Sequence, residues 1–174
     1  RPQEPESPLG YKTEEVTFTN QKAHVSLAGT LTYPVNYTPD KKVPVVIMVT
    51  GSGAQNRDEE VFAHKPFRVI ADYLAKQGIA SLRYDDRGVG QSTGNQAGCT
   101  SADFAEDAAC GLSWLKSSGK FNQVGILGHS EGGLIAFMLG AEGKADFLVS
   151  MAGPGIKGDS LLVEQQNALF KLKG

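Results

Sequence analysis

The residues with the clearest chemical potential read Gly-His-Ser-Glu-Gly at positions 128–132 and match the pattern Gly-x-Ser-x-Gly. The preceding residues 123–127 have strand composition and residues 131–140 have helix composition, which predicts a sharp strand-to-helix turn at Ser130. Such a turn strains the serine backbone and holds its hydroxyl beyond the edge of a sheet. The pattern therefore predicts that Ser130 is a nucleophile, with a chance glycine–serine turn as the alternative.

The neighbours of Ser130 suit this role. Gly128 and Gly132 carry no side chain, so adjacent stretches of chain can pass close to the serine. Ser130 also lies at the N-terminus of the expected helix, where the helix dipole favours a developing negative charge. The carboxylate of Glu131 is expected to be exposed beside the serine, where it could shape a pocket.

The rest of the chain predicts elements that could position this turn. Two β-rich runs, 15–20 and 22–33, are separated by a polar break and indicate an antiparallel hairpin. Strands and helices then alternate as β-α-β-α-β-α-β, which is typical of an α/β fold with a mostly parallel sheet and helices on both faces. The four strands of this alternation are expected at residues 45–50, 79–84, 123–127 and 147–151.

Helical spacing identifies the faces that should cover this sheet. The first helix is expected to bury Phe67, Ile70, Tyr73 and Leu74 and to end at Gly78. The second should begin near residue 102, with Thr100 or Ser101 as its cap. Its apolar face is expected to include Phe104, Ala108, Leu112 and Leu115, with Trp114 at the edge of the core.

A ligand site in such a sheet is expected in loops that follow the carboxyl ends of the strands, here residues 51–57, 85–94, 128–132 and 152–158. Charged residues gather in or beside the first two loops. They could contact an acidic or sugar-like substrate, but we favour a structural role, in which ion pairs hold the loops. The residues concerned are Arg57, Asp58, Arg83, Asp85, Asp86 and Arg87.

Three stretches together resemble the α/β-hydrolase superfamily of the serine-nucleophile type, and bacterial secreted acyl-hydrolases and esterases within it. The first is Gly-His-Ser-Glu-Gly at 128–132, and the second is Gly-Ser-Gly-Ala-Gln-Asn-Arg-Asp at 51–58, where the family keeps its oxyanion-hole loop. The third is Arg-Tyr-Asp-Asp-Arg-Gly-Val-Gly-Gln-Ser at 83–92, which is similar to the family's Asp-x-Arg-Gly-x-Gly-x-Ser loop. Their order and spacing match the N-terminal two-thirds of the family.

The resemblance implies a serine hydrolase that cleaves carboxylic esters of small molecules through an acyl-enzyme on Ser130, without a cofactor. It implies oxyanion donors at the backbone N–H groups of Glu131 and of Ser52, or less favourably of Gly53. Family members often begin the oxyanion loop with His-Gly where this chain has Thr-Gly, a difference expected to affect substrate fit. Two alternatives stay open: a serine peptidase of the aminopeptidase or prolyl-peptidase kind, and an inactive fold remnant that acts as a binding module.

A general base for Ser130 is not evident. The fold places Asp or Glu and then His after the serine, and no histidine follows Ser130. His24 is expected on a solvated face of the hairpin, His64 could line the mouth of the site, and the His129 side chain should point away from the serine. The sequence thus favours a chain that ends before the family's final strands and lacks the catalytic Asp and His. We expect a flexible lead-in at 1–14, a partial core at 15–157 and the start of a cap or lid helix at 158–174.

Composition narrows the classes of partner. Seventeen basic against nineteen acidic residues provide no basic footprint for nucleic acid or an anionic membrane. The longest apolar run, 45–49, is far shorter than the ~20 residues that span a bilayer, so we expect no transmembrane segment. No zinc, phosphate-loop or dinucleotide motif is present, so neither a metal nor a cofactor is expected. The oligomeric state stays open.

Export to the periplasm or the extracellular space is favoured, because the chain starts at Arg1 with a proline-rich stretch, as after removal of a targeting peptide. Export would permit a disulfide between Cys99 and Cys110. The expected helix would separate the two residues too widely, so two unpaired thiols are the favoured interpretation.

Overall fold

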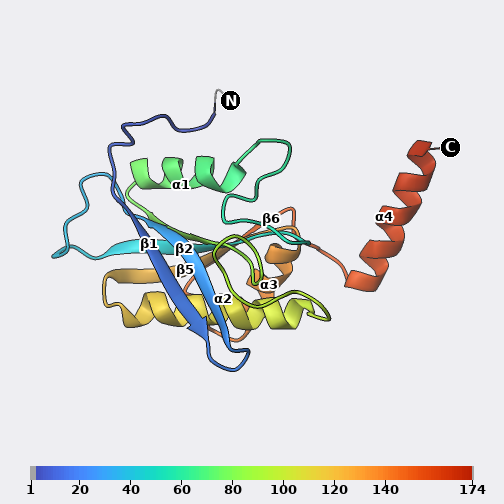
Figure 1. Cartoon of the computed structure of the whole chain (residues 1–174). Coiled ribbons are helices and arrows are strands. Elements are labelled where there is room, and N and C mark those ends of the chain that lie inside the picture. The colour runs from blue at the N-terminus through green and yellow to red at the C-terminus, as the bar shows by residue number, and fades with distance from the viewer. Residues whose placement is uncertain (1–2, 174) are drawn as a thin grey trace.

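The structure is a computed structural model that describes residues 3–173. Six strands form one sheet in the order β1-β2-β4-β3-β5-β6, with α1, α2 and α3 packed on its faces (Figure 1). The elements in chain order are β1 (Thr13–Asn20), β2 (Val25–Thr32), β3 (Val43–Val49), α1 (Pro66–Lys76), β4 (Ala80–Tyr84), α2 (Ser101–Ser117), β5 (Phe121–His129), α3 (Glu131–Ala141), β6 (Leu148–Met151) and α4 (Gly158–Lys173).

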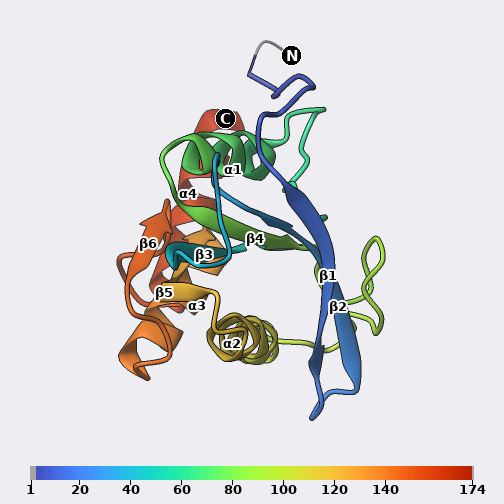
Figure 2. The same cartoon turned by 90° about the vertical axis from the view of Figure 1, so that its left-hand side faces the viewer.

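The sheet topology confirms the expected α/β architecture. β1 and β2 form the antiparallel hairpin, and β2 also pairs antiparallel with β4. β3 pairs parallel with β4 and with β5, and β5 pairs parallel with β6. Figure 2 shows α1 on one face of the sheet and α2 and α3 on the other. This arrangement brings the carboxyl ends of β3, β4, β5 and β6 to one edge, where their loops meet.

Burial on both faces explains why the central strand is so apolar. Residues 45–49 of β3 are all at most 3% exposed. Ile47 packs into the larger core with α2 and α3, whereas Met48 packs with Phe67 and Ala71 of α1 on the opposite face. A strand covered by helices on both sides has no polar face, and a nearly continuous apolar run is the result.

The expectation for Tyr73 is wrong, whereas the expectation for His24 is right about its exposure but not about its place in a strand. Tyr73 is 63% exposed, because the face of α1 that meets the sheet runs through Phe67, Ala71 and Ala75. His24 is exposed, but it lies in the turn between β1 and β2 with a φ of +54°, since β2 begins only at Val25. The expectation for the second helix holds: Thr100 is its N-cap and forms a capping box with Asp103.

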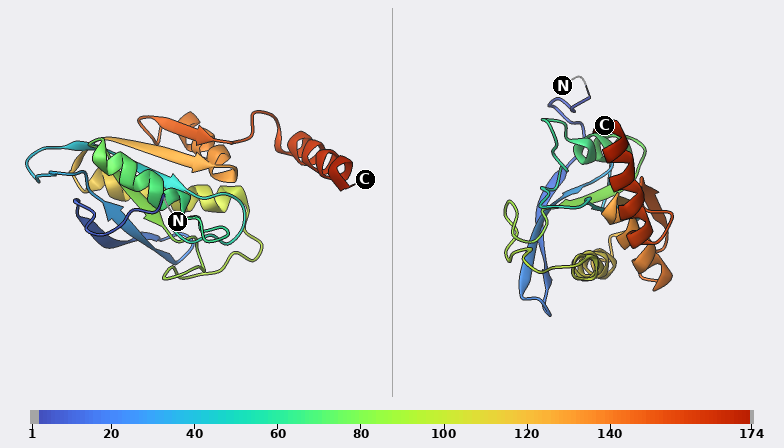
Figure 3. Two further views of the ribbon diagram at one scale, coloured as in Figure 1. Left: turned by 90° about the horizontal axis from the view of Figure 1, so that it is seen from above. Right: turned by 90° about the vertical axis from the view of Figure 1, so that its right-hand side faces the viewer.

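The last helix, α4, projects away from the sheet (Figures 1 and 3). Its large apolar side chains are mostly exposed, namely Leu162, Val163, Leu169, Phe170 and Leu172. Among residues 3–173, no helix is both long enough and apolar enough to cross a membrane. Cys99 and Cys110 are unpaired thiols, as favoured from the sequence.

Candidate active site

Ser130 occupies the turn between the end of β5 and the start of α3, and its backbone is strained, with φ 53° and ψ −115°. A non-glycine residue with positive φ costs free energy and persists only where the surroundings hold it. Two hydrogen bonds do so: the Ser130 N–H donates to the carbonyl of Met151 in β6, and its carbonyl accepts from the N–H of Gly133, both at 2.9 Å. The turn is therefore fixed from both sides.

Close approach of backbone explains the two glycines of the turn. A Cβ added to Gly128 would lie 1.9 Å from the carbonyl oxygen of Gly132, and one added to Gly132 would lie 2.2 Å from that of Val49. Neither distance is compatible with a side chain, so any larger residue must displace backbone. The close approach expected from the sequence is thus present in the structure.

The loop after β3, residues 50–57, is held by buried carboxylates. Three of its backbone N–H groups donate to carboxylate oxygens instead of to other backbone groups. The Thr50 hydroxyl also donates to a carboxylate oxygen, that of Asp86. The backbone pairs are Gly51 with Glu59 at 2.7 Å, Gln55 with Asp86 at 3.0 Å and Arg57 with Asp85 at 2.9 Å. These bonds fix the shape of a loop that has no regular secondary structure.

Unpaired N–H groups remain between these anchors. Within residues 3–173, the backbone N–H groups of Ser52, Gly53 and Glu131 donate to no other group. The Glu131 N–H is left over because the first turn of a helix has no intrahelical acceptors. The resemblance to the α/β hydrolases implies a role as oxyanion donors for these three groups.

Two cavities open beside Ser130, and both also touch Ser52. One, of about 420 Å³, is lined by Gly51, Ser52, Gln55, Glu59, Val61, His64, Pro66, His129 and Ser130. The other, of about 360 Å³, lies toward α4 and has mostly small or apolar lining residues, including Leu134, Ala152, Pro154, Leu161 and Leu162. A molecule bound at Ser130 can therefore extend in two directions.

The histidines do not contact the serine. His64 and His129 line the larger cavity with Ser130, but neither makes a hydrogen bond to its hydroxyl among the described residues. Nδ1 of His129 instead lies 2.8 Å from a carboxylate oxygen of Glu59. His24 is in the β1–β2 turn and takes no part in either cavity. Within residues 3–173, therefore, no histidine forms a hydrogen bond with the Ser130 hydroxyl.

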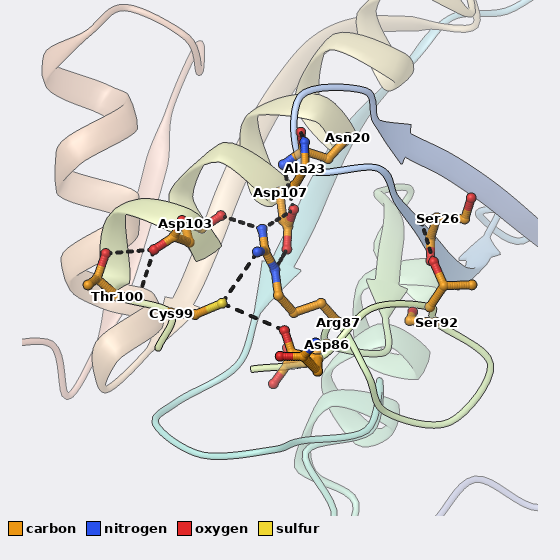
Figure 4. A network of polar contacts seen from close by, with 12 residues as sticks. Asn20, Ala23, Ser26, Asp86, Arg87, Ser92, Cys99, Thr100, Asp103 and Asp107 are labelled. Atoms are coloured by element: carbon orange, nitrogen blue, oxygen red, sulfur yellow. Dashed lines mark hydrogen bonds and ion pairs between the residues drawn. The ribbon is translucent and has the colours of Figure 1, made fainter. Parts of the chain in front are cut away.

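Five of the six charged residues singled out in these loops form ion pairs, and Asp86 accepts hydrogen bonds instead, which supports the structural role favoured above. Arg57 binds Asp85 through Nε and through Nη2, the latter at 2.8 Å, and Arg83 pairs with Asp58. Arg87 makes a two-pronged contact with Asp107 of α2, at 2.7 and 2.8 Å (Figure 4). Each pair joins one loop to another element.

Asp107 and Glu59 were missed by the sequence reasoning. Asp107 is 2% exposed, and it also accepts a hydrogen bond from Asn20 at 2.7 Å, so it ties α2 to both β1 and the loop after β4. The one sequence signal for Asp107 was its place beside Ala108 on an apolar helix face.

Glu131 also differs from expectation: its carboxylate is half-buried and accepts a hydrogen bond from the Ser101 hydroxyl at 2.6 Å.

Asp86 has an unusual environment for a carboxylate. Burial, with smaller contributions from the negative charges of Asp107 and Glu59, raises its pKa to about 7, although hydrogen bonds from Thr50 and Gln55 act in the opposite direction. A group whose pKa is raised by folding stabilises the protein fully below its unfolded value, near 4, and loses that contribution as the pH rises to its folded value. Ionisation of Asp86 thus lowers the stability progressively between about pH 4 and pH 7.

Asp86→Asn is expected to remove this pH dependence, because asparagine resembles the protonated acid and cannot ionise. The free energy of unfolding of the variant minus that of the unmodified protein should grow between pH 5 and pH 8, toward a ceiling of about 4 kcal/mol. Urea unfolding at several pH values measures this difference. A difference that stays constant over this range would contradict the raised pKa.

Among the described residues, no group of three or more His, Cys, Asp or Glu side chains is arranged to hold a metal ion. The polar groups near Ser130 include its own hydroxyl, backbone N–H groups and the Glu59–His129 pair. This set suits addition of a nucleophile to a carbonyl group, with stabilisation of the oxyanion that forms.

Comparison with known proteins agrees with this architecture. The sequence profile described as serine aminopeptidase, S33, matches residues 64–172. Esterase EstD of Thermotoga maritima is 30% identical over 165 residues, which cover 95% of this chain and 38% of EstD. The structure of the Pyrococcus furiosus esterase Pf2001 superposes with a TM-score of 0.67 at 25% identity, over 84% of this chain and 51% of that one.

The α/β hydrolase GrgF of Penicillium sp. sh18 has the same fold, with a TM-score of 0.68 at 23% identity over 82% of this chain and 46% of that one. This chain spans about half the length of the solved structures and 38% of EstD. The profile match covers more than half of the chain and includes the strand, turn and helix around Ser130. The chain belongs to the S33 serine aminopeptidase family of α/β hydrolases.

Proposed function

We propose that this protein is a serine hydrolase that cleaves carboxylic esters through an acyl-enzyme on Ser130. The observation that carries the proposal is the strained Ser130 turn, which opens on two cavities. The Ser130 oxygen adds to the ester carbonyl, its proton goes to a general base and then to the departing alcohol, and an ester bond to Ser130 remains. Water then cleaves this bond, releases the acid and restores the hydroxyl.

The oxyanion of each tetrahedral intermediate would accept hydrogen bonds from the N–H groups of Ser52 and Glu131, with Gly53 as the alternative to Ser52. The absence of other acceptors for these groups among residues 3–173 supports this assignment. One such donor typically contributes about 3 kcal/mol to transition-state stabilisation. The carboxylates that anchor the loop after β3 would hold the Ser52 donor in place before substrate binds.

The general base and its acidic partner lie, in this proposal, outside these 174 residues. Two observations support this: no histidine of the described chain bonds to Ser130, and the chain spans 38% of EstD. We place them in the part of the full-length protein that corresponds to the unmatched length of its relatives. Activity is therefore a property of the full-length protein, and the 174 residues alone are expected to be inactive.

A serine peptidase of the aminopeptidase or prolyl-peptidase kind is the second candidate, because the matching family takes its description from a serine aminopeptidase. Both reactions use the same nucleophile and oxyanion donors, so the Ser130 turn does not separate them. We favour esters because the relatives with the higher identity, EstD and Pf2001, are described as esterases. The leucines that line the cavity beside α4, Leu134, Leu161 and Leu162, suit an acyl or alcohol group without charge.

A parallel assay of the full-length protein tests the proposal, with p-nitrophenyl esters and aminoacyl p-nitroanilides as substrates and a fluorophosphonate probe as label. We expect faster turnover of the esters and covalent labelling at Ser130, located by peptide mass spectrometry. Faster turnover of the anilides would favour the peptidase. Absence of both turnover and labelling would overturn the hydrolase assignment and favour a binding module.

A further inference from the structure

Glu59 contacts both sides of the candidate active site through one oxygen atom. Its Oε1 accepts a hydrogen bond from the Gly51 N–H at 2.7 Å and lies 2.8 Å from Nδ1 of His129. Gly51 begins the loop that carries Ser52, and His129 directly precedes Ser130. Because the carboxylate oxygen is an acceptor, this contact is a hydrogen bond when Nδ1 of His129 carries the ring proton. Glu59 and His129 are 70 residues apart in the sequence.

This contact is maintained at a cost. Glu59 is 5% exposed and has a φ of +52°, so the fold both buries a carboxylate and strains its backbone. Burial of a charge without partners is strongly unfavourable, and backbone strain persists only where surrounding contacts determine it. The Glu59 N–H donates to the carbonyl of Asn56 at 2.9 Å, which closes a tight turn and directs the side chain at the site.

The position of Gly51 bears directly on the nucleophile. A Cβ added to Gly51 would lie 3.2 Å from Cβ of Ser130, so the backbone of Gly51 passes close to the Ser130 side chain. A shift of Gly51 would also move the adjacent Ser52 N–H relative to the Ser130 oxygen. Misplacement of a reacting or stabilising group by about 1 Å can cost on the order of 10²-fold in rate.

We propose that Glu59 is a positioning residue that sets the distance between the loop carrying Ser52 and the turn carrying Ser130. One acceptor oxygen holds both elements in register, through Gly51 on one side and His129 on the other. This inference rests on the proposed function. The role assigned to Glu59 is to hold these two elements and includes no proton transfer, so the position of its oxygen matters more than its charge.

Two substitutions distinguish the effect of the position of the Glu59 oxygen from the effect of its charge. Glu59→Gln keeps an acceptor oxygen at the same reach and removes the charge, whereas Glu59→Asp keeps the charge and shortens the side chain by one methylene group. In the full-length protein we expect Glu59→Gln to retain kcat within about 3-fold and Glu59→Asp to lose about 10- to 100-fold, both with nearly unchanged KM. The same changes at exposed Glu60 are the matched controls and should alter neither constant.

Steady-state kinetics with a p-nitrophenyl ester, with urea unfolding of each variant, measure these effects. The inference is overturned if Glu59→Asp matches its Glu60 control, if Glu59→Gln is more impaired than Glu59→Asp, or if KM changes instead of kcat. Failure of either Glu59 variant to fold would also overturn it, since a positioning role leaves the fold intact. An unmodified full-length protein without hydrolase activity would instead contradict the proposed function, which keeps the two failures distinct.

Discussion

Ser130→Ala in the full-length protein should lower kcat for ester hydrolysis by at least about 10³-fold and leave the fold unchanged. The substitution removes the oxygen that forms the bond to the acyl group, so no acyl-enzyme can accumulate. It adds no atom to a turn in which φ is already 53°, and the two backbone hydrogen bonds of Ser130 do not involve its side chain. Stability should therefore stay close to that of the unmodified protein.

Steady-state rates and the initial burst of p-nitrophenolate measure the loss. Ser117→Ala is the matched control: this serine lies at the end of α2, where its hydroxyl is exposed and bonds only to the carbonyl of Trp114. The control should retain both burst and turnover. A Ser130→Ala variant that keeps a substantial part of the activity would place the nucleophile at another residue.

The arrangement of the sheet could be predicted from local sequence because its signals are local. The apolar run at 45–49 favours burial on both faces, and strand–helix alternation favours parallel pairing with crossovers. Tyr73 shows where such signals fail. Its size and spacing suggested burial, but α1 approaches the sheet through the small residues Ala71 and Ala75, and the bulkier ring is left in solvent.

Part of the candidate site could likewise be predicted from local sequence, and part of it could not. Gly128, Ser130 and Gly132 form a pattern within five residues, so the turn and its close contacts could be predicted. The contacts of Glu59 with His129 and of Asp107 with Asn20 join residues 70 and 87 positions apart. No spacing rule connects such residues, because their meeting depends on how the completed sheet brings its loops together.

Gly132→Ala is expected to impair both activity and stability, since the added methyl group would meet backbone at two places. Its Cβ would lie 2.2 Å from the carbonyl oxygen of Val49 and 2.6 Å from that of Thr50. These carbonyls end β3 and begin the loop that carries Ser52. Relief of the clash must therefore separate α3 from β3, which also separates Ser130 from the Ser52 N–H. We expect a loss of about 3 kcal/mol in the free energy of unfolding and about 10²-fold in kcat.

Gly119→Ala separates this clash from the general cost of removing a glycine. Gly119 has a φ of +68°, but a Cβ there would meet nothing within 4 Å. Backbone strain alone should cost about 1–2 kcal/mol of stability and leave kcat unchanged. Urea unfolding and ester kinetics on both variants of the full-length protein give the comparison. If Gly132→Ala lost no more than Gly119→Ala in either measurement, the close packing of α3 against the end of β3 would not be what holds the Ser130 turn, and the strain at Ser130 would need another source.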